Sequence, residues 1–459
     1  MQTDQQMNVE MTSPSLSFPL PVSENSLVNS VPIRVPPTSS GPYNQTNNVI
    51  RITLPNSSLL RFSNTCGILM TVTIPALGAL QASGVSALFN QMTLRFNSSA
   101  SGTIEQITSI HVLSSMLLYH VSDDYCRSVA SNLEGVAPEP NLLGNVDYGN
   151  FIAARGPTAA ARTYQFLWKP VSGFFNQTVF PASLFPNVVL ELVLNPGQRA
   201  LIYNPNSADS TAADIITACA YSIDSVYFCA EALTCTSAYT SALADHVIKS
   251  GLVIKIPSYS GTTVSLSTSQ NQVIRLGTHS SLSHVLFGIV PEVLYTRAAT
   301  TTANLATNLW RRDTLSYFAG SLYAAADDGT QQDFLADYSW ETDGQRIPST
   351  PITLNWRNNA IAYSNALACR GLLQNYSSGV RFSLNNNATL VNKQVHSYDF
   401  SSDSEMQTSL ALDRVVNLSL VLNFSRDPVQ IAQLFFFRRY HVTMKIEPGT
   451  GSVSVIYDL

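Results

Sequence analysis

Histidine is the residue best suited to acid–base or metal chemistry near neutral pH, and this 459-residue chain has seven. His279 and His284 are five positions apart, in a segment whose pattern indicates a strand and a turn, with no carboxylate close by in sequence. Metal sites need three or four converging ligands. The sequence therefore predicts satisfied or solvated histidines and no metal site. The histidines are His111, His120, His246, His279, His284, His396 and His441.

Paired carboxylates occur at Asp123-Asp124 and at Asp327-Asp328. General acid–base catalysis uses carboxylates that face each other at a defined separation, which sequence neighbours rarely provide. Asp327-Asp328 precedes Gly329 and is typical of a turn, whereas Asp123-Asp124 is typical of a helix start. No G-x-S-x-G elbow, P-loop or G-x-G-x-x-G occurs. We expect no catalytic residue, no cofactor and no enzyme activity, although a triad assembled from distant residues stays open.

Six cysteines are present, and none forms a C-x-x-C pair. Cys229 and Cys235 come nearest to one another, without a second pair or a histidine that would complete a zinc site. We interpret the cysteines as small buried side chains in a reducing compartment. The set is Cys66, Cys126, Cys219, Cys229, Cys235 and Cys369.

The N-x-S/T sequons and the tryptophans are two further groups, whose usual roles are glycosylation and the stacking of bases or sugars. The first six residues lack the apolar core of a secretory signal, so we do not expect the N-x-S/T sequons to be glycosylated. The tryptophans are spread out, unlike a stacking platform for bases or sugars, and are expected in the core. The sequons begin at Asn44, Asn56, Asn97, Asn176, Asn375, Asn387, Asn417 and Asn423, and the tryptophans are Trp168, Trp310, Trp340 and Trp356.

Charge is scarce in this chain. Only 12% of residues are charged while 45% are hydrophobic, and Ser, Thr and Asn carry the polarity. Interface cores are depleted in charge, so a surface largely covered by partners is favoured, with a Thr/Asn-rich extracellular β protein as the alternative. Net charge is −5, and residues 1–37 contain one basic residue, Arg34. Direct nucleic-acid binding is therefore not expected. No apolar run is long enough to span a bilayer.

The elements expected to organise these residues are mostly strands. Apolar residues alternate from Leu88 to Phe96, a Ser/Gly turn follows, and Ile104-Glu105 returns briefly. Ile107, Ile110, Leu113 and Leu117 then recur at helical spacing. A helix-bearing excursion of this kind in a long β chain is a feature of few architectures.

The chain divides into four parts by pattern. Residues 1–46 are rich in Ser, Pro and Asn and predict an extended arm. Strand patterns fill 47–235, a short amphipathic helix is expected within 236–250, and strand patterns resume over 251–459. Long loops are expected at 132–160 and 297–338, and a second helix at 359–373. Residues 251–459 thus repeat the order of elements of residues 47–235 without repeating their sequence.

This order of elements resembles the double jelly-roll major capsid proteins, the lineage of adenovirus hexons, tailless membrane-containing phages, virophages and Polinton-like viruses. The resemblance spans most of residues 47–459 and is closest to the virophage and Polinton-like branch. It is a resemblance of pattern and order, with no single diagnostic motif. The stretches that carry it are Ala87–Tyr119, Val188–Pro196, Tyr221–Phe228 with the helix and Lys255–Tyr259 that follow, and Asp399-Phe400 with the strands over Asn417–Tyr457.

The resemblance implies an all-β fold of two eight-stranded jelly rolls in tandem with short helical excursions. It further implies a structural role: a homotrimer whose six jelly rolls form a pseudo-hexameric capsomer of an icosahedral shell. Neighbouring capsomers, penton and minor capsid or cement proteins would be its partners, inside a virion assembled in the host cell. Whether an inner membrane lies beneath that shell stays open. The alternatives are a secreted or surface β-sandwich adhesin or carbohydrate-binding protein, and an all-β hydrolase.

Overall fold

The structure is a computed structural model of the 459-residue chain. The residues that it describes are 27–56, 59–62, 66–81, 83–97, 102–118, 130–136, 160–177, 179–203, 212–282, 284–296, 335–342, 344–354, 361–362, 364–365, 395–400, 410–428 and 431–458.

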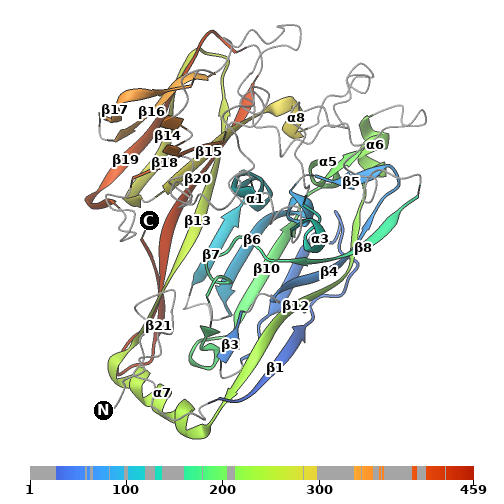
Figure 1. The fold of residues 1–459 in the computed structure, drawn as a ribbon, viewed down its shortest axis with the longest axis vertical. Coiled ribbons are helices and arrows are strands. Elements are labelled where there is room, and N and C mark those ends of the chain that lie inside the picture. The colour runs from blue at the N-terminus through green and yellow to red at the C-terminus, as the bar shows by residue number, and fades with distance from the viewer. Residues whose placement is uncertain are drawn as a thin grey trace, which may run out of the picture.

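The first half of the chain folds into two facing antiparallel sheets (Figure 1). Sheet I has the order β8-β4-β12-β3-β9. Strands β4 and β3 pair with successive parts of one edge of β12, and β1 pairs with its opposite edge. Sheet II has the order β2-β10-β6-β7. The bounds are β1 Leu27–Val35, β2 Val49–Thr53, β3 Leu59–Arg61, β4 Gly67–Ile74, β6 Phe89–Phe96, β7 Thr103–Thr108, β8 Arg162–Trp168, β9 Val179–Phe180, β10 Val188–Leu194 and β12 Ser222–Cys235.

The second half repeats this arrangement. Sheet III has the order β13-β20-β15-β18, with β21 paired to β20, and sheet IV has the order β14-β19-β16-β17. The bounds are β13 Leu252–Leu266, β14 Asn271–Leu282, β15 His284–Pro291, β16 Leu335–Thr342, β17 Gln345–Thr353, β18 Val395–Asp399, β19 Leu410–Phe424, β20 Ala432–Ile446 and β21 Val453–Asp458.

The two halves have the same topology. If the main strands of each half are counted along the chain, one sheet runs first–eighth–third–sixth and the other second–seventh–fourth–fifth. This is β1-β12-β4-β8 with β2-β10-β6-β7 in the first half, and β13-β20-β15-β18 with β14-β19-β16-β17 in the second. An eight-stranded, two-sheet arrangement of this kind is a jelly roll. The predicted fold class, two jelly rolls in tandem, is therefore confirmed.

Helix α7 (Ser237–Ser250) connects the jelly rolls, where the sequence predicts a helix. The side chain of Thr236 accepts a hydrogen bond from the backbone N–H of Tyr239 at 3.3 Å and caps its first turn. Gly251, at φ +76°, ends the helix in a conformation that favours glycine. The remaining elements are β5 Gly78–Leu80, η2 Gly84–Leu88, α1 Ile110–Leu118, α3 Ser131–Leu133, η4 Ala182–Leu184, α5 Gly197–Ala200, β11 Leu201–Tyr203, α6 Ala212–Ala218 and α8 Glu292–Thr296.

Three expectations need correction. Residues 27–35 lie within the expected arm but form β1, because a strand at a sheet edge tolerates Pro32, which cannot donate to a ladder. The helical spacing begins at Ile107, yet Ile107 belongs to β7 and helix α1 begins at Ile110. The expected loop at 297–338 ends earlier, because β16 begins at Leu335.

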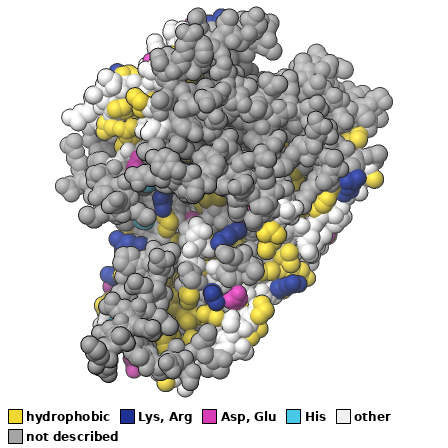
Figure 2. All heavy atoms as spheres, in the orientation of Figure 1, with side chains coloured by type: hydrophobic (Ala, Val, Ile, Leu, Met, Phe, Trp, Pro, Cys, Tyr) yellow, Lys and Arg dark blue, Asp and Glu magenta, His cyan; other side chains and the backbone are white. Residues whose placement is uncertain are grey.

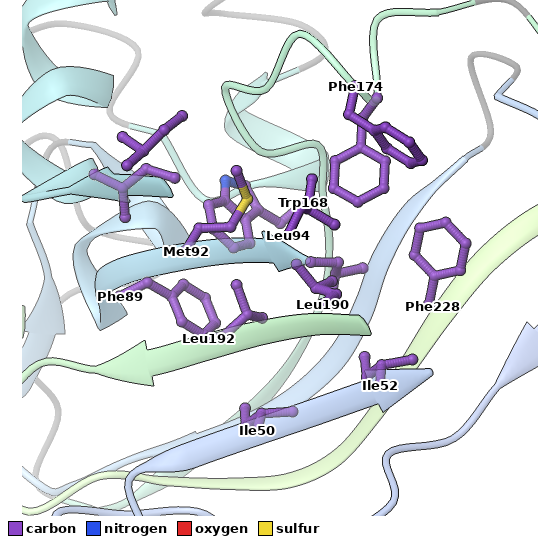
Figure 3. Packing of buried hydrophobic residues seen from close by; sticks show 14 of the residues in the cluster. Ile50, Ile52, Phe89, Met92, Leu94, Trp168, Phe174, Leu190, Leu192 and Phe228 are labelled. Carbon is purple, nitrogen blue, oxygen red and sulfur yellow. The ribbon is translucent and has the colours of Figure 1, made fainter. Parts of the chain in front are cut away.

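Hydrophobic residues fill the space between the sheets of each jelly roll. In the first, Trp168 stacks on Phe89 with ring centroids 4.5 Å apart, and Ile50, Leu94 and Leu190 point into the same core (Figure 3). In the second, Trp340 is fully buried and lies edge-on to Phe287 at 5.8 Å. Each core thus contains a fully buried tryptophan, which agrees with the expectation for Trp168 and Trp340.

Candidate functional site: the seam between the jelly rolls

Within the described part of the chain, the residues considered for chemistry do not come together in one place. His111 and His396 are buried, and desolvation lowers the pKa of each to about 3, so both are neutral near neutral pH. His246 lies on α7, His279 on β14 and His441 on β20. Over the described residues, no three His, Cys, Asp or Glu side chains approach closely enough to hold a metal ion.

His284 does have an acidic neighbour, which corrects the expectation from sequence. Its Nε2 atom lies 3.6 Å from Oδ2 of Asp399, because β15 and β18 pair these two residues directly. The sequence separation of the two residues conceals this contact. One histidine and one carboxylate with half-buried side chains make an ion pair when the ring is protonated, and they are too few for a metal site.

The described cysteines and the sequon residue Asn423 lie within the packed part of the fold. Cys66 and Cys219 are buried, Cys229 and Cys235 are half-buried, and burial raises the pKa of the Cys66 thiol to about 12. Asn423 donates from its side chain to Asp337 at 2.6 Å across the β16–β19 pair. Several residues discussed from the sequence lie outside the described residues: His120, Asp123-Asp124, Cys126, Trp310, Asp327-Asp328, Trp356, Cys369, Asn375 and Asn387.

The most unusual chemistry lies where the two jelly rolls meet, which we call the seam. Strand β7, the edge of sheet II, runs beside β13, the edge of sheet III (Figure 1). Thr108 donates from its hydroxyl to the carbonyl of Gly261 at 3.1 Å, and Ser258 donates to the Glu105 carboxyl at 2.7 Å. Both contacts join residues 153 positions apart, so the two strands run parallel to one another.

Glu105 is the central polar residue of the seam and is fully buried. Its carboxyl accepts hydrogen bonds from the hydroxyls of Ser172 at 2.5 Å and Ser258 at 2.7 Å, and from the backbone N–H of Gly173 at 3.2 Å. Ser172 and Gly173 belong to the first jelly roll and Ser258 to the second. Desolvation raises the pKa of Glu105, and the donated hydrogen bonds oppose that rise. One carboxyl therefore links both jelly rolls.

A glycine permits the close approach of the two halves. A Cβ atom on Gly173 would lie 1.7 Å from the carbonyl oxygen of Pro257 in β13. That oxygen belongs to the backbone, so the strand itself would have to move to make room. Glycine at this position therefore sets how closely the loop after β8 packs against the second jelly roll.

An aromatic contact closes the far end of the seam. Tyr295 on α8 stacks on His111 of α1 with ring centroids 6.2 Å apart, and the Arg199 guanidinium lies 4.7 Å from the Tyr295 ring centre. Tyr295 also lies against Phe435 of β20 at 4.9 Å. Cation–π and stacking contacts thus join α1 and α5 of the first jelly roll to α8 of the second.

Sheet III is consequently covered on both faces. Phe436 and Phe287 belong to the core of the second jelly roll, whereas Phe435, Phe437 and Leu286 belong to the hydrophobic cluster shared with the first. The run Leu434–Phe437 is apolar throughout for this reason. Strand periodicity does not reveal the seam, and the one signal in the sequence is Glu105, the single charged residue of β7.

Comparisons with known proteins agree with this geometry. No protein-family model and no curated protein matches the sequence. Solved structures do match the fold. The structure of PBCV-1 VP54 matches at TM-score 0.59 and 14% identity, over 94% of this chain and 98% of that one. The Faustovirus major capsid protein matches at TM-score 0.57 and 10% identity over 93% and 92% of the two chains. The mavirus major capsid protein matches at TM-score 0.52 and 10% identity over 100% and 96%. The chain has the double jelly-roll fold of these proteins, as the sequence resemblance predicts.

Replacing Gly173 with Ala tests the close approach at the seam. The added methyl group meets the Pro257 carbonyl, so we expect a loss of unfolding free energy of about 1–3 kcal/mol, typical of overpacking. Urea unfolding measures it. Gly78→Ala is the matched control, because its Cβ would approach no atom closer than 3.1 Å. Equal stability of the two variants would show that the seam adjusts freely.

Replacing Glu105 with Gln tests the ionisation of the buried carboxyl. The folded-state pKa is raised above the ordinary 4.5, so the stabilisation that Glu105 gives is present below that pH and is lost as pH rises toward the folded pKa. Wild-type unfolding free energy should fall relative to Glu105→Gln at up to about 1.4 kcal/mol per pH unit in that window. Parallel pH profiles of the two proteins, measured by urea unfolding, would contradict the raised pKa.

Proposed function

We propose that this protein is a major capsid protein, the building block of an icosahedral viral shell. The observation that carries the proposal is the match, along nearly its whole length, to major capsid proteins of several viruses. That match covers both jelly rolls together with their mutual packing, and not a single sandwich domain. Two jelly rolls joined by a buried seam form one block, which suits a part that must keep its shape under assembly.

In this role three chains form a trimer, so that six jelly rolls make a pseudo-hexameric capsomer. A cyclic trimer uses a head-to-tail interface that closes on itself. Neighbouring capsomers, penton proteins and minor capsid or cement proteins are the proposed partners, and the virion is the proposed location. The low charge of the chain supports extensive contacts, because few ions must be desolvated when its surfaces are covered.

The proposed role is structural and needs no catalysis, cofactor or direct contact with nucleic acid. The polar groups concentrated at the seam are buried and bonded to each other, so they act in holding the jelly rolls together. None of the helices within the described ranges has both the length and the apolar character that a membrane crossing requires. The alternative of an adhesin or carbohydrate-binding protein finds no support in the comparisons.

The mass and outline of the purified chain test the proposal. Light scattering should give three times the 49.9 kDa of one chain, and negative-stain images should show a six-cornered particle. The expected cause is the closed head-to-tail ring of six jelly rolls. A monomer with a two-lobed outline at micromolar concentration would overturn the proposed trimer. A glycan-binding screen of the same sample would then be the next measurement.

A further inference from the structure

We infer that the free edge of β21 binds residues 16–22 of the same chain, which add to sheet III as one further antiparallel strand. The inference goes beyond the proposed function, because it assigns a binding partner to a segment that precedes the described part of the chain. It follows from three observations: a strand edge that is left open, a segment whose residue pattern fits that edge, and the short connection between the two.

The edge of β21 is open where its counterpart in the first jelly roll is covered. Strand β12 pairs with β4 and, further along, with β3, just as β20 pairs with β15 and then with β21. The outer edge of β3 pairs with β9, whose Phe180 lies opposite Leu60 and is 1% exposed. Among the strands that the structure describes, β21 pairs with β20 alone, and Ile456 and Tyr457 are 48% and 37% exposed. The place that β9 has in the first jelly roll is thus open in the described part of the second.

Strand β21 also lacks the features that usually protect an exposed edge. Prolines and basic side chains on an edge strand discourage the addition of another strand. Strand β1 has both, in Pro32 and the exposed Arg34, and Figure 2 shows a few basic side chains among the uncharged ones on the lower right, over β1 and β12. The sequence of β21, Val-Ser-Val-Ile-Tyr-Asp, contains neither a proline nor a basic residue. The edge of β21 therefore needs a covering strand, whereas β1 protects itself.

Backbone hydrogen bonds in the turn between β20 and β21 show which residues face the open edge. The N–H of Glu447 donates to the carbonyl of Ser452 at 2.9 Å, so Ser452 and every second residue after it point their backbone groups toward β20. Val453, Val455 and Tyr457 therefore point theirs toward the open edge. The side chains of Val453 and Val455 pack against the hydrophobic cluster that both jelly rolls share. A residue paired directly with one of these three places its side chain on the same inner face.

Residues 16–22 have the pattern that this edge requires. Apolar residues alternate with serine and proline in the order Leu16-Ser17-Phe18-Pro19-Leu20-Pro21-Val22. When the apolar residues pair with β21, each of them has an N–H group to donate, and their side chains extend the inner face beside Val453 and Val455. The two prolines then lie on the outer edge, where they prevent a further strand from adding. One orientation of the segment thus satisfies the backbone, continues the apolar face and protects the new edge.

The segment lies within reach of β21 in the same chain. Strand β1 begins at Leu27, opposite Cys235 and two residues before α7, and β21 begins at Val453, opposite Ile446. Helix α7 lies between the two places, at the bottom of the view in Figure 1, and its 14 residues span about 21 Å at a rise of 1.5 Å per residue. Seven extended steps from Leu27 back to Leu20 span up to about 24 Å. Leu20 can therefore lie beside Val453.

This reach fixes the register of the added strand. With Leu20 beside Val453, an antiparallel strand brings Phe18 beside Val455. Phe18 then has the position on β21 that Phe180 of β9 has on β3, an aromatic side chain on the covering strand. The segment of the same chain is favoured over that of a second copy, because a connection of a few residues holds it beside the edge at a high effective concentration.

A cysteine pair in the full chain tests the register. Phe18→Cys with Val455→Cys, oxidised with diamide, should form a disulfide within one chain, in which two thiols are oxidised and one diamide is reduced. The product should run on a non-reducing gel as a single copy, faster than the reduced chain. Phe18→Cys with Ser454→Cys is the matched control and should not cross-link, because Ser454 lies on the opposite face of β21. Equal yields from the two pairs would overturn the inference, and a cross-link between copies would assign the edge to a second copy instead.

Amide hydrogen exchange measures the same contact without added cysteines. The amides of Val453, Val455 and Tyr457 should exchange slowly in the wild type, and Phe18→Asp should speed their exchange about tenfold or more, because a charge on the inner face releases the segment. Ser17→Asp is the matched control and should leave exchange unchanged, since its side chain lies on the other face. Fast exchange of these amides in the wild type, or the same exchange in both variants, would contradict the inference. Both readouts concern one chain, so they stand or fall separately from the proposed trimer.

Discussion

The packing of sheet III against the first jelly roll is the interaction on which the rest of this structure depends. It covers the second face of a sheet whose first face already lies on its own core. The stretches Val285–Val290 of β15 and Leu434–Phe437 of β20 are therefore apolar on both sides. Exposing that second face to water would forfeit about 25 cal/mol for each Å² of apolar surface. The two jelly rolls are therefore one cooperative body, and α7 is a connection between them rather than a flexible tether.

Glu105 shows what a polar group contributes at such a place. A buried carboxyl is costly unless its hydrogen bonds are made, and here the donors come from both jelly rolls. Apolar packing tolerates small shifts between the two halves, whereas three hydrogen bonds on one carboxyl fix their relative position. The close contact of Gly173 with Pro257 has the same effect by sterics. A few residues thus set the relative orientation of the two jelly rolls, and many apolar residues stabilise the contact between them.

The two jelly rolls share a topology but have diverged in surface chemistry. Where sheet III carries Phe435 and Phe437, sheet I carries Ser225 and Tyr227 at the equivalent positions. A face that is covered as the chain folds can be fully apolar. A face that stays in contact with water in the single chain carries hydroxyl groups, and serine and threonine provide them without the desolvation cost of ions.

The sequence by itself determined the local structure: strand alternation, the helix of the linker and the apolar run Leu434–Phe437 follow from period and composition, which act over short distances. It also indicated the two-part plan, and with it the fold. What only the tertiary structure decided were the pairings of distant residues. The Asp399 partner of His284, the place of β1 in sheet I and the three donors around Glu105 depend on strand register across more than 60 positions. Periodicity says which face a residue occupies, but which strand lies opposite is settled by packing of the whole chain.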